Sequence, residues 1–293
     1  MAALLAGDVD LIENVPPTDI KTLHRNDKTE IVSTSGNRIM YLHLDHDRPT
    51  SPHAVGPKGE NPLRDVRVRE ALSIAINRKA LVDRIMDGEG IPAGQLVPEG
   101  YFGYSPNIAV PKYDPKGAMK LLAEAGYPKG FKMTSHASND RYPNDEKIAQ
   151  AIGQMFSKIG LDISVVTLPK SVYFSRASAR EFSFIMGGAA VETGEASGVL
   201  GPLLATFNKE KGQGQGNRGR YSNPKFDGNY QTALMTVDDA KREKLLQEAM
   251  EISMGEVGVI PLFFLVNSWG LKTGLKLEPR SDGYTLAYTV SKK

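Results

Sequence analysis

The chain has 293 residues, of which 40% are hydrophobic and 24% are charged. These proportions are typical of a folded protein with one large domain or two, and they exclude an intrinsically disordered chain. The formal net charge is only +2 and there is no cysteine. A strongly basic nucleic-acid binder, a disulfide framework, a thiolate metal site and a cysteine nucleophile are therefore excluded.

The first predicted element is a helix at the start of the chain. Ala2–Ala6 followed by Gly7 is typical of a helix that ends at a glycine. A strand, a helix and two further strands are expected next, at Val9–Ile12, Pro16–His24, Glu30–Thr34 and Arg38–Leu44. Arg48–Asn61 contains several prolines and glycines, which predict a long loop.

The middle of the chain alternates between helical and strand patterns. Helices are predicted at Asp65–Asn77, Arg78–Met86, Asp114–Gly126, Asn144–Gly160 and Ser171–Ala179. Strands are predicted at Phe131–Ser135, Leu161–Thr167 and Phe182–Met186. Asp65, Asp114 and Asn144 are expected to cap the helices that they begin. This alternation indicates the α/β class.

The last third of the chain begins with the glycine-rich stretch Gly187–Gly219. We expect a long loop there, with one helix at Ser197–Phe207. Further helices are predicted at Lys225–Met235 and Asp239–Met254, and strands at Val257–Val266 and Tyr284–Val290.

Catalytic and metal-binding motifs are missing. The sequence has no G-x-S-x-G, P-loop or H-E-x-x-H pattern, so no enzyme, metal or cofactor is predicted. His43 and His46 end a predicted strand, where alternating side chains do not point both rings at one site. Gly214–Gly219 matches G-x-G-x-x-G, but it neither follows a strand nor opens a helix, so we interpret it as a loop.

Two loops are candidates for a binding site. Asn139–Asn144 lies between a predicted strand and a predicted helix, where α/β proteins usually bind ligands. Arg141 is suited to a carboxylate and Tyr142 to stacking. In Gly187–Glu195 the glycines allow a ligand to approach the backbone, and the two glutamates are suited to a cation. A solvated turn is the alternative at both places.

Several segments resemble bacterial extracellular solute-binding protein family 5, the dipeptide-, oligopeptide- and nickel-binding receptors of ABC importers. Asp65–Leu72 and Ala75–Val82 resemble its signature segment. Further similar segments follow the family's order: Gly7–Ile12, Tyr101–Tyr104, Tyr113–Pro115, Leu121–Tyr127, Tyr221–Asp227 and Val259–Leu262. The resemblance covers essentially the whole chain.

The resemblance implies an α/β, periplasmic-binding-protein-like lobe (class II), with a mixed sheet flanked by helices and remnants of the other lobe at both termini. Residues 1–44 would be a lobe-one remnant with the first hinge crossing. Residues 45–262 would be lobe two, which binds the ligand, and residues 263–293 the return crossing with a second remnant. The family's members are longer and begin with a signal peptide, so we expect this chain to be a fragment of a periplasmic protein.

The resemblance also implies individual roles. The loop that contains Arg141 supplies an arginine for the carboxylate of a bound peptide. The family's Trp-x-x-Asp stretch has Gly188 at the tryptophan and Val191 at the aspartate, so a nearby glutamate is expected to hold the ammonium group instead. The predicted ligand-binding residues are Asn139, Arg141, Tyr142, Gly188, Glu192 and Glu195.

The predicted function is the substrate-binding component of an ABC importer, which captures a peptide or peptide-like solute for a membrane permease. No cofactor and no nucleic-acid partner are expected. The alternatives are a non-binding fragment or interaction module, and an opine, a sugar or another non-peptide ligand. The lobe-one remnants would have sheet edges that the missing lobe normally covers. Exposed edges pair readily with another chain, so we expect self-association through these remnants.

Overall fold

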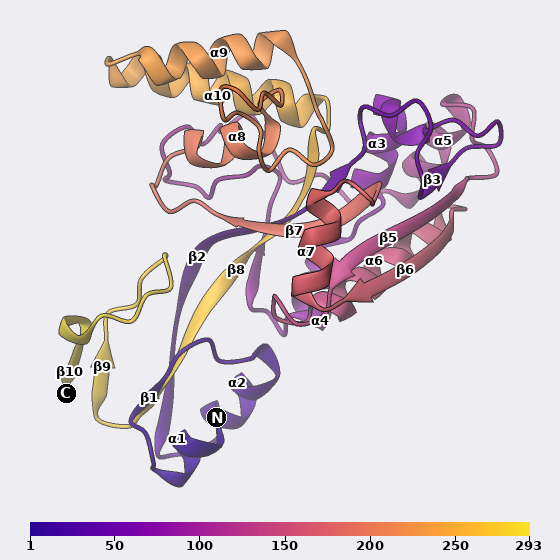
Figure 1. The fold of residues 1–293 in the computed structure, drawn as a ribbon. Coiled ribbons are helices and arrows are strands. Elements are labelled where there is room, and N and C mark those ends of the chain that lie inside the picture. Colours follow the sequence, from indigo (N-terminus) through magenta and orange to yellow (C-terminus); the bar gives the residue numbers. More distant parts are fainter.

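The computed structural model describes residues 1–293, arranged in two parts of unequal size (Figure 1). The larger part contains residues 45–258, and the smaller part contains residues 1–28 and 273–293 with both termini. Two long antiparallel strands, β2 (Thr29–Leu44) and β8 (Val259–Lys272), run from one part into the other. They are the main covalent and hydrogen-bonded connection between the two parts.

The main sheet has eight strands in mixed orientation. Its order is β1-β8-β2-β7-β5-β3, with β4 paired to β8 and β6 paired to β5. Strands β5, β6 and β7 are mutually parallel, whereas β2 is antiparallel to both of its neighbours. The remaining bounds are β1 (Leu11–Ile12), β3 (Ala54–Val55), β4 (Gly90–Pro92), β5 (Lys132–Ser138), β6 (Asp162–Leu168) and β7 (Phe184–Ala190).

Helices cover both faces of this sheet. One face packs against α3 (Val66–Ile74), α4 (Arg78–Ile85), α5 (Pro115–Glu124) and α6 (Asp145–Lys158). The other packs against α8 (Ser197–Leu204), α9 (Pro224–Met235) and α10 (Asp239–Gly255). A further helix, α7 (Lys170–Ser178), packs with Phe182 and Ile185 at β7.

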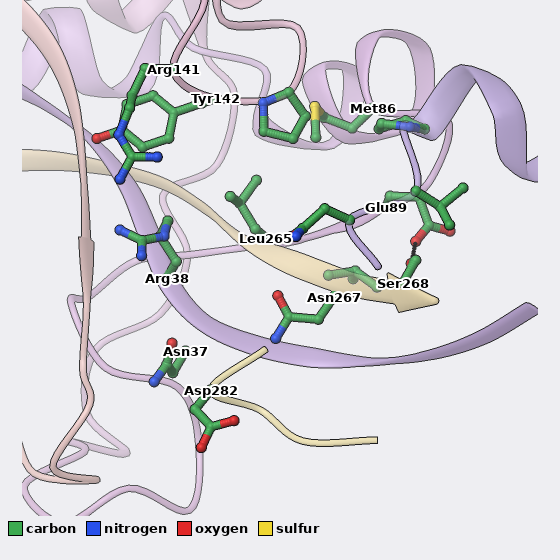
Figure 2. A pocket seen from close by; sticks show the side chains of 15 residues that line it. Asn37, Arg38, Met86, Glu89, Arg141, Tyr142, Leu265, Asn267, Ser268 and Asp282 are labelled. Atoms are coloured by element: carbon green, nitrogen blue, oxygen red, sulfur yellow. Dashed lines mark hydrogen bonds between the residues drawn. The ribbon is translucent and has the colours of Figure 1, made fainter. Parts of the chain in front are cut away.

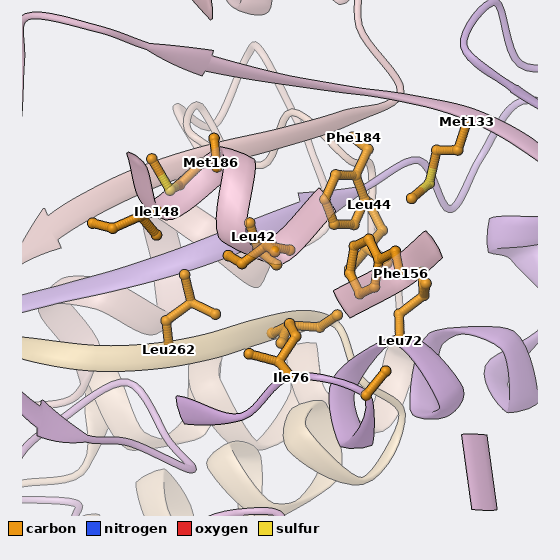
Figure 3. Close-up of a cluster of buried hydrophobic side chains, with 14 of the residues drawn as sticks. Leu42, Leu44, Leu72, Ile76, Met133, Ile148, Phe156, Phe184, Met186 and Leu262 are labelled. Carbon is orange, nitrogen blue, oxygen red and sulfur yellow. The ribbon is translucent and has the colours of Figure 1, made fainter. Parts of the chain in front are cut away.

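Strand alternation explains why there are two cores. Met40, Leu42 and Leu44 of β2 point into the core beneath α3–α6, whereas Ile39 and Tyr41 point into the core beneath α8–α10. Figure 3 shows Leu42 and Leu44 among the buried side chains of the first core. Each face of the strand therefore contributes to a separate hydrophobic layer.

The smaller part has little core of its own. It contains α1 (Ala2–Ala6), α2 (Pro17–His24), β9 (Leu275–Leu277) and β10 (Val290–Lys292). One cluster joins Leu4, Val15, Ile20 and Leu23, and another joins Trp269, Leu271 and Leu277. Both clusters rest on the ends of β2 and β8 that extend beyond the larger part.

Several predicted elements are confirmed, including α1, α2 and the capping of α3 and α5. The Asp65 carboxylate accepts from the backbone N–H of Arg67, and the Asp114 carboxylate accepts from that of Gly117. Alternation of helices and strands in the larger part is also confirmed. No helix combines the length and the apolar character that crossing a bilayer requires.

Asn144 stands at the N-cap position of α6 as predicted, but its side chain does not cap the helix. Asn144 has a left-handed φ of 54°, and its side-chain amide donates to the carbonyl of Ile85 over 2.8 Å. The next residue, Asp145, accepts from backbone N–H groups around the helix start instead. The asparagine thus anchors the loop to α4.

Strand boundaries differ most from the predictions. The two strands predicted at Glu30–Thr34 and Arg38–Leu44 are one strand, β2, whose register against β8 shifts between Ser35 and Ile39. Strand β8 continues six residues beyond the predicted Val266, to Lys272. Pairing with β8 continues on both sides of this shift, which joins the two predicted segments into one strand.

Two further predictions are wrong. Strand β7 continues to Ala190, so Gly187 and Gly188 lie in a strand and not in a loop; Gly188 pairs with Met40 of β2. At the C-terminal end, the strand predicted at Tyr284–Val290 is largely absent. A short 3₁₀ helix, η2 (Ala287–Thr289), precedes the brief strand β10 there.

Candidate ligand-binding cavity

A cavity of about 360 Å³ lies between the larger part and the smaller part (Figure 2). Its walls come from β2, from β8, from the turn after α4, from the β5–α6 loop and from both terminal segments of the chain. Distant stretches of sequence therefore meet at one site, beside the two strands that connect the parts.

Arg141 enters this cavity from the β5–α6 loop, and its loop is held firmly. The buried Asp145 carboxylate accepts from the backbone N–H groups of Arg141 and Tyr142, at 3.1 and 3.2 Å, and from the Ser138 hydroxyl at 2.8 Å. The Arg141 guanidinium carbon lies 5.0 Å from the centre of the Tyr142 ring, within the range of a cation–π contact. The loop thus presents a positioned guanidinium group to the cavity.

Tyr142 is buried, and its hydroxyl group joins the β5–α6 loop to the sheet. Its hydroxyl accepts from the backbone N–H of Gly188 at 3.0 Å and donates to the carbonyl of the same residue at 3.2 Å. Tyr142 and Gly188 therefore fasten the β5–α6 loop to β7. This explains how the ring fits against Arg141 on one side and the sheet on the other.

Space at position 188 is already filled. A Cβ atom built on Gly188 would lie 2.9 Å from Cε1 of Tyr142 and 3.0 Å from Sδ of Met40. The tyrosine ring thus occupies the volume into which a side chain at 188 would project.

Gly188→Ala is expected to destabilise the protein by about 1–3 kcal/mol, because the added methyl group overpacks this contact. The decrease in urea midpoint measures the effect. Gly228→Ala, in the middle of α9 with open space around its Cβ position, is the matched control and is expected to be neutral or stabilising. Equal stability of Gly188→Ala and the parent protein would contradict this tight packing of Tyr142 against Gly188.

Two arginines in the cavity have no acidic partner. Arg38 of β2 and Arg141 both line it, and neither guanidinium group forms a hydrogen bond or an ion pair. Figure 2 shows both side chains at the same end of the cavity. That end is therefore suited to a negatively charged ligand group.

The cavity also contains two carboxylates. Asp282 is held in an ion pair with Arg280 and accepts from the backbone N–H of Tyr284 at 3.0 Å. Glu89, in the turn between α4 and β4, accepts only from the Ser268 hydroxyl, at 2.7 Å. In Figure 2, Glu89 lies away from the two arginines, toward the other end. The site thus has positive charge at one end and negative charge at the other.

The other residues singled out from the sequence lie elsewhere. Asn139 is exposed at the end of β5 and does not line the cavity. Glu192 is exposed in the loop after β7 and does not line it either. The Glu195 carboxylate forms an ion pair with Arg242 of α10 at 2.5 Å. The structure thus brings Arg141, Tyr142 and Gly188 together and leaves the other three apart.

Sequence reasoning missed Arg38 and Glu89. A weak signal exists for the first, because Arg38 stands directly before the apolar stretch Ile39–Leu42 of the same strand. Glu89 stands between two glycines and gives no signal of its own. It reaches the cavity because Gly90 pairs with Leu265 of β8.

Comparison with known proteins gives a consistent picture. Residues 1–211 match the family described as "Bacterial extracellular solute-binding proteins, family 5 Middle". Heme-binding protein A of Haemophilus influenzae is 29% identical over 297 residues, which cover 99% of this chain and 51% of that protein. The Dipeptide-binding protein of Escherichia coli (strain K12) is 27% identical over 254 residues, 86% of this chain and 45% of that protein.

The solved structures show the fold. The ABC transporter-associated periplasmic binding protein DppA from Helicobacter pylori, in complex with peptide STSA, superposes with a TM-score of 0.83 at 22% identity. The match covers 99% of this chain and 54% of that one, so the chain spans about half the length of the proteins it matches. The fold is that of the periplasmic binding proteins. The chain belongs to the bacterial extracellular solute-binding proteins of family 5.

Proposed function

We propose that the chain is the ligand-binding portion of the substrate-binding component of an ABC importer, and that it holds a peptide or peptide-like solute in the cavity beside β2 and β8. The observation that carries the proposal is the guanidinium of Arg141, which faces the cavity without an acidic partner. A carboxylate is the natural partner of such a group, because the two form charge-assisted, often bidentate hydrogen bonds. The family consists of solute-binding proteins and not of enzymes.

The other end of a peptide carries an ammonium group, for which Glu89 is the proposed acceptor. Its carboxylate faces the same cavity and is engaged only by a hydroxyl group. Glu192 stays a second proposed acceptor. It lies two residues after the end of β7, and its carboxylate is exposed. Asn139 and Glu195 stay predictions from the sequence. To bind a ligand, the Glu195 carboxylate would have to leave its ion pair with Arg242.

Delivery to a membrane permease from the periplasm is proposed from the names of the related proteins, one of which is an ABC transporter-associated periplasmic binding protein. In this proposal residues 1–44 and 263–293 contain the crossings and the lobe-one portions, and residues 45–262 form lobe two. Because β2 and β8 connect the two parts, closure around a solute would bend these strands. A solute shifts the equilibrium between the open and the closed form only by as much as it binds the closed form more tightly.

Thermal melts with a panel of solutes test the proposal. Di- and tripeptides, an opine, a sugar and nickel are each added to the whole chain at high concentration. A solute at a hundred times its Kd adds about 2.7 kcal/mol of stability, which raises the melting temperature by several degrees. We expect peptides to give this shift and Arg141→Gln to lose most of it.

The control is Arg84→Gln, which alters an exposed arginine of α4 that forms no ion pair and does not line the cavity. This variant should keep the full shift. A cooperative melt that no solute moves would contradict the proposal and favour a non-binding fragment or an interaction module. A shift with an opine or a sugar alone would replace the peptide by that class.

Self-association through the smaller part stays a prediction. Tyr284 and Tyr288 are 64% and 80% exposed there, which leaves aromatic surface open to a second chain. Sedimentation velocity over a range of concentrations would show a rising average mass if it occurs. A constant monomer mass would contradict it.

A further inference from the structure

We propose that Arg38 is a second anion-binding residue, so that the cavity prefers a solute with two anionic groups, such as an acidic dipeptide with its two carboxylates. This inference rests on the proposed function, because it narrows the class of solute that the same cavity takes.

The backbone around Arg38 is fixed on both sides. The side-chain amide of Asn37 donates to the Val191 carbonyl at 3.2 Å, and the Val191 N–H donates to the Asn37 carbonyl at 3.1 Å. The Asn37 N–H donates to the Ser281 carbonyl at 2.9 Å, and Arg38 itself pairs with Ala190 of β7. Arg38 therefore projects from a rigid point, next to the place where the β2–β8 register shifts.

The Arg38 side chain is half-buried and has no hydrogen bond or ion pair within the protein. A charged group that is partly removed from water requires a compensating partner. The carboxylates that share the cavity do not provide one, since Asp282 pairs with Arg280 and Glu89 lies toward the other end with Ser268. The missing partner is therefore expected to come with the solute.

Arg141 is exposed rather than half-buried, but it lies at the same end of the cavity and likewise forms no ion pair. A solute with a single carboxylate can neutralise one of the two guanidinium groups and leaves the other unpaired. A solute with two anionic groups can pair with both, and its ammonium group can reach toward Glu89. This charge pattern favours an amino-bearing dicarboxylate over a neutral dipeptide.

Calorimetric titration of the whole chain with matched dipeptides tests the inference. Ala-Asp is compared with Ala-Asn, and Asp-Ala with Asn-Ala, because each pair differs by one charge at nearly constant shape. We expect one acidic dipeptide to bind at least about tenfold more tightly than its amide partner, the effect of one charge-assisted contact. Arg38→Gln should abolish this preference, so that the acidic dipeptide binds no more tightly than its amide partner.

Arg38→Lys keeps the charge and should keep part of the preference, and Arg84→Gln should keep all of it. Amide partners that bind as tightly as the acidic dipeptides would overturn the inference while leaving the proposed function intact. A preference that survives in Arg38→Gln would overturn the assignment to this residue. Failure of all four dipeptides, with the chain folded, would overturn the proposed peptide binding and this inference together.

Discussion

Arg78→Ala is expected to lower the free energy of unfolding by about 3–5 kcal/mol, because it removes a buried charged group on which several hydrogen bonds depend. Arg78 is only 2% exposed, and its guanidinium group joins three elements. It donates to the Pro261 carbonyl of β8 at 2.8 Å, and to the carbonyl and hydroxyl of Ser73 in α3 at 2.9 and 3.0 Å. Its own helix, α4, is thereby tied to both.

All of these acceptors are neutral, which makes Arg78 a buried charge without a carboxylate. Burial lowers the pKa of Arg78 to about 10, so the side chain is still charged at neutral pH. Truncation to alanine would leave buried oxygen atoms without donors and would open a cavity, and each of these costs stability.

Equilibrium unfolding in urea measures the effect of Arg78→Ala. The matched control is Lys79→Ala, one position further along α4, where the side chain is 80% exposed and pairs only with Asp83. That change is expected to alter stability by no more than about 0.5 kcal/mol. Similar losses in both variants would show that Arg78 does not hold the three elements together.

Acidification is expected to destabilise the protein strongly between pH 7 and pH 5, because burial keeps three histidines, His43, His46 and His136, in their neutral form and lowers the pKa of His46 to about 3. His43 is 2% exposed and His136 is 3% exposed. Burial, with a smaller contribution from Arg218, lowers the pKa of His43 to about 3. Burial, together with His53 and Arg176, lowers the pKa of His136 to about 4.

The unfolded state takes up protons before the folded state as the pH falls, because a histidine in the unfolded chain has a pKa near 6.5. The stability that the neutral rings contribute is therefore fully present above about pH 6.5 and is lost as the pH falls toward the folded-state pKa values. Each ring accounts for a loss of about 2 kcal/mol between pH 7 and pH 5.

Urea unfolding at pH 7, 6 and 5 measures this dependence. His43→Phe removes one of the three groups and should make the slope of stability against pH shallower. His24→Phe changes an exposed histidine of α2 and is the control, which should leave the slope as it is. Parallel slopes in His43→Phe and the parent protein would show that His43 is not held neutral by burial.

The fold was predictable wherever short-range signals decide it. Asp65 and Asp114 cap their helices as predicted, because an aspartate before a helical pattern needs only the next few residues to act. The length of β7 was not predictable in this way. Its glycines are typical of a loop, yet Gly188 is held in the sheet by pairing with β2, almost 150 residues earlier in the chain.

The residues of the candidate site also fall into two groups, those placed by local sequence and those placed by pairing between distant segments. Arg141 and Tyr142 follow a strand and precede a helix, so their position is apparent from local pattern. Arg38 and Glu89 come from distant segments that the pairings of β2 and β4 with β8 bring to the cavity. The ion pair of Glu195 with Arg242 was likewise hidden, because it depends on how α10 packs beside the loop.

A peptide-like solute is proposed to bind between the two parts through the unpaired arginines, and Arg141 is the residue on which this proposal depends most. The most direct measurement is an NMR titration of the arginine side-chain Nε–Hε signals in the whole ¹⁵N-labelled chain, using the dipeptide that raises the melting temperature most. We predict that the Arg141 signal moves with saturation while the Arg84 signal stays in place. Saturable binding that leaves Arg141 unmoved, or no binding by any peptide, would contradict the proposal.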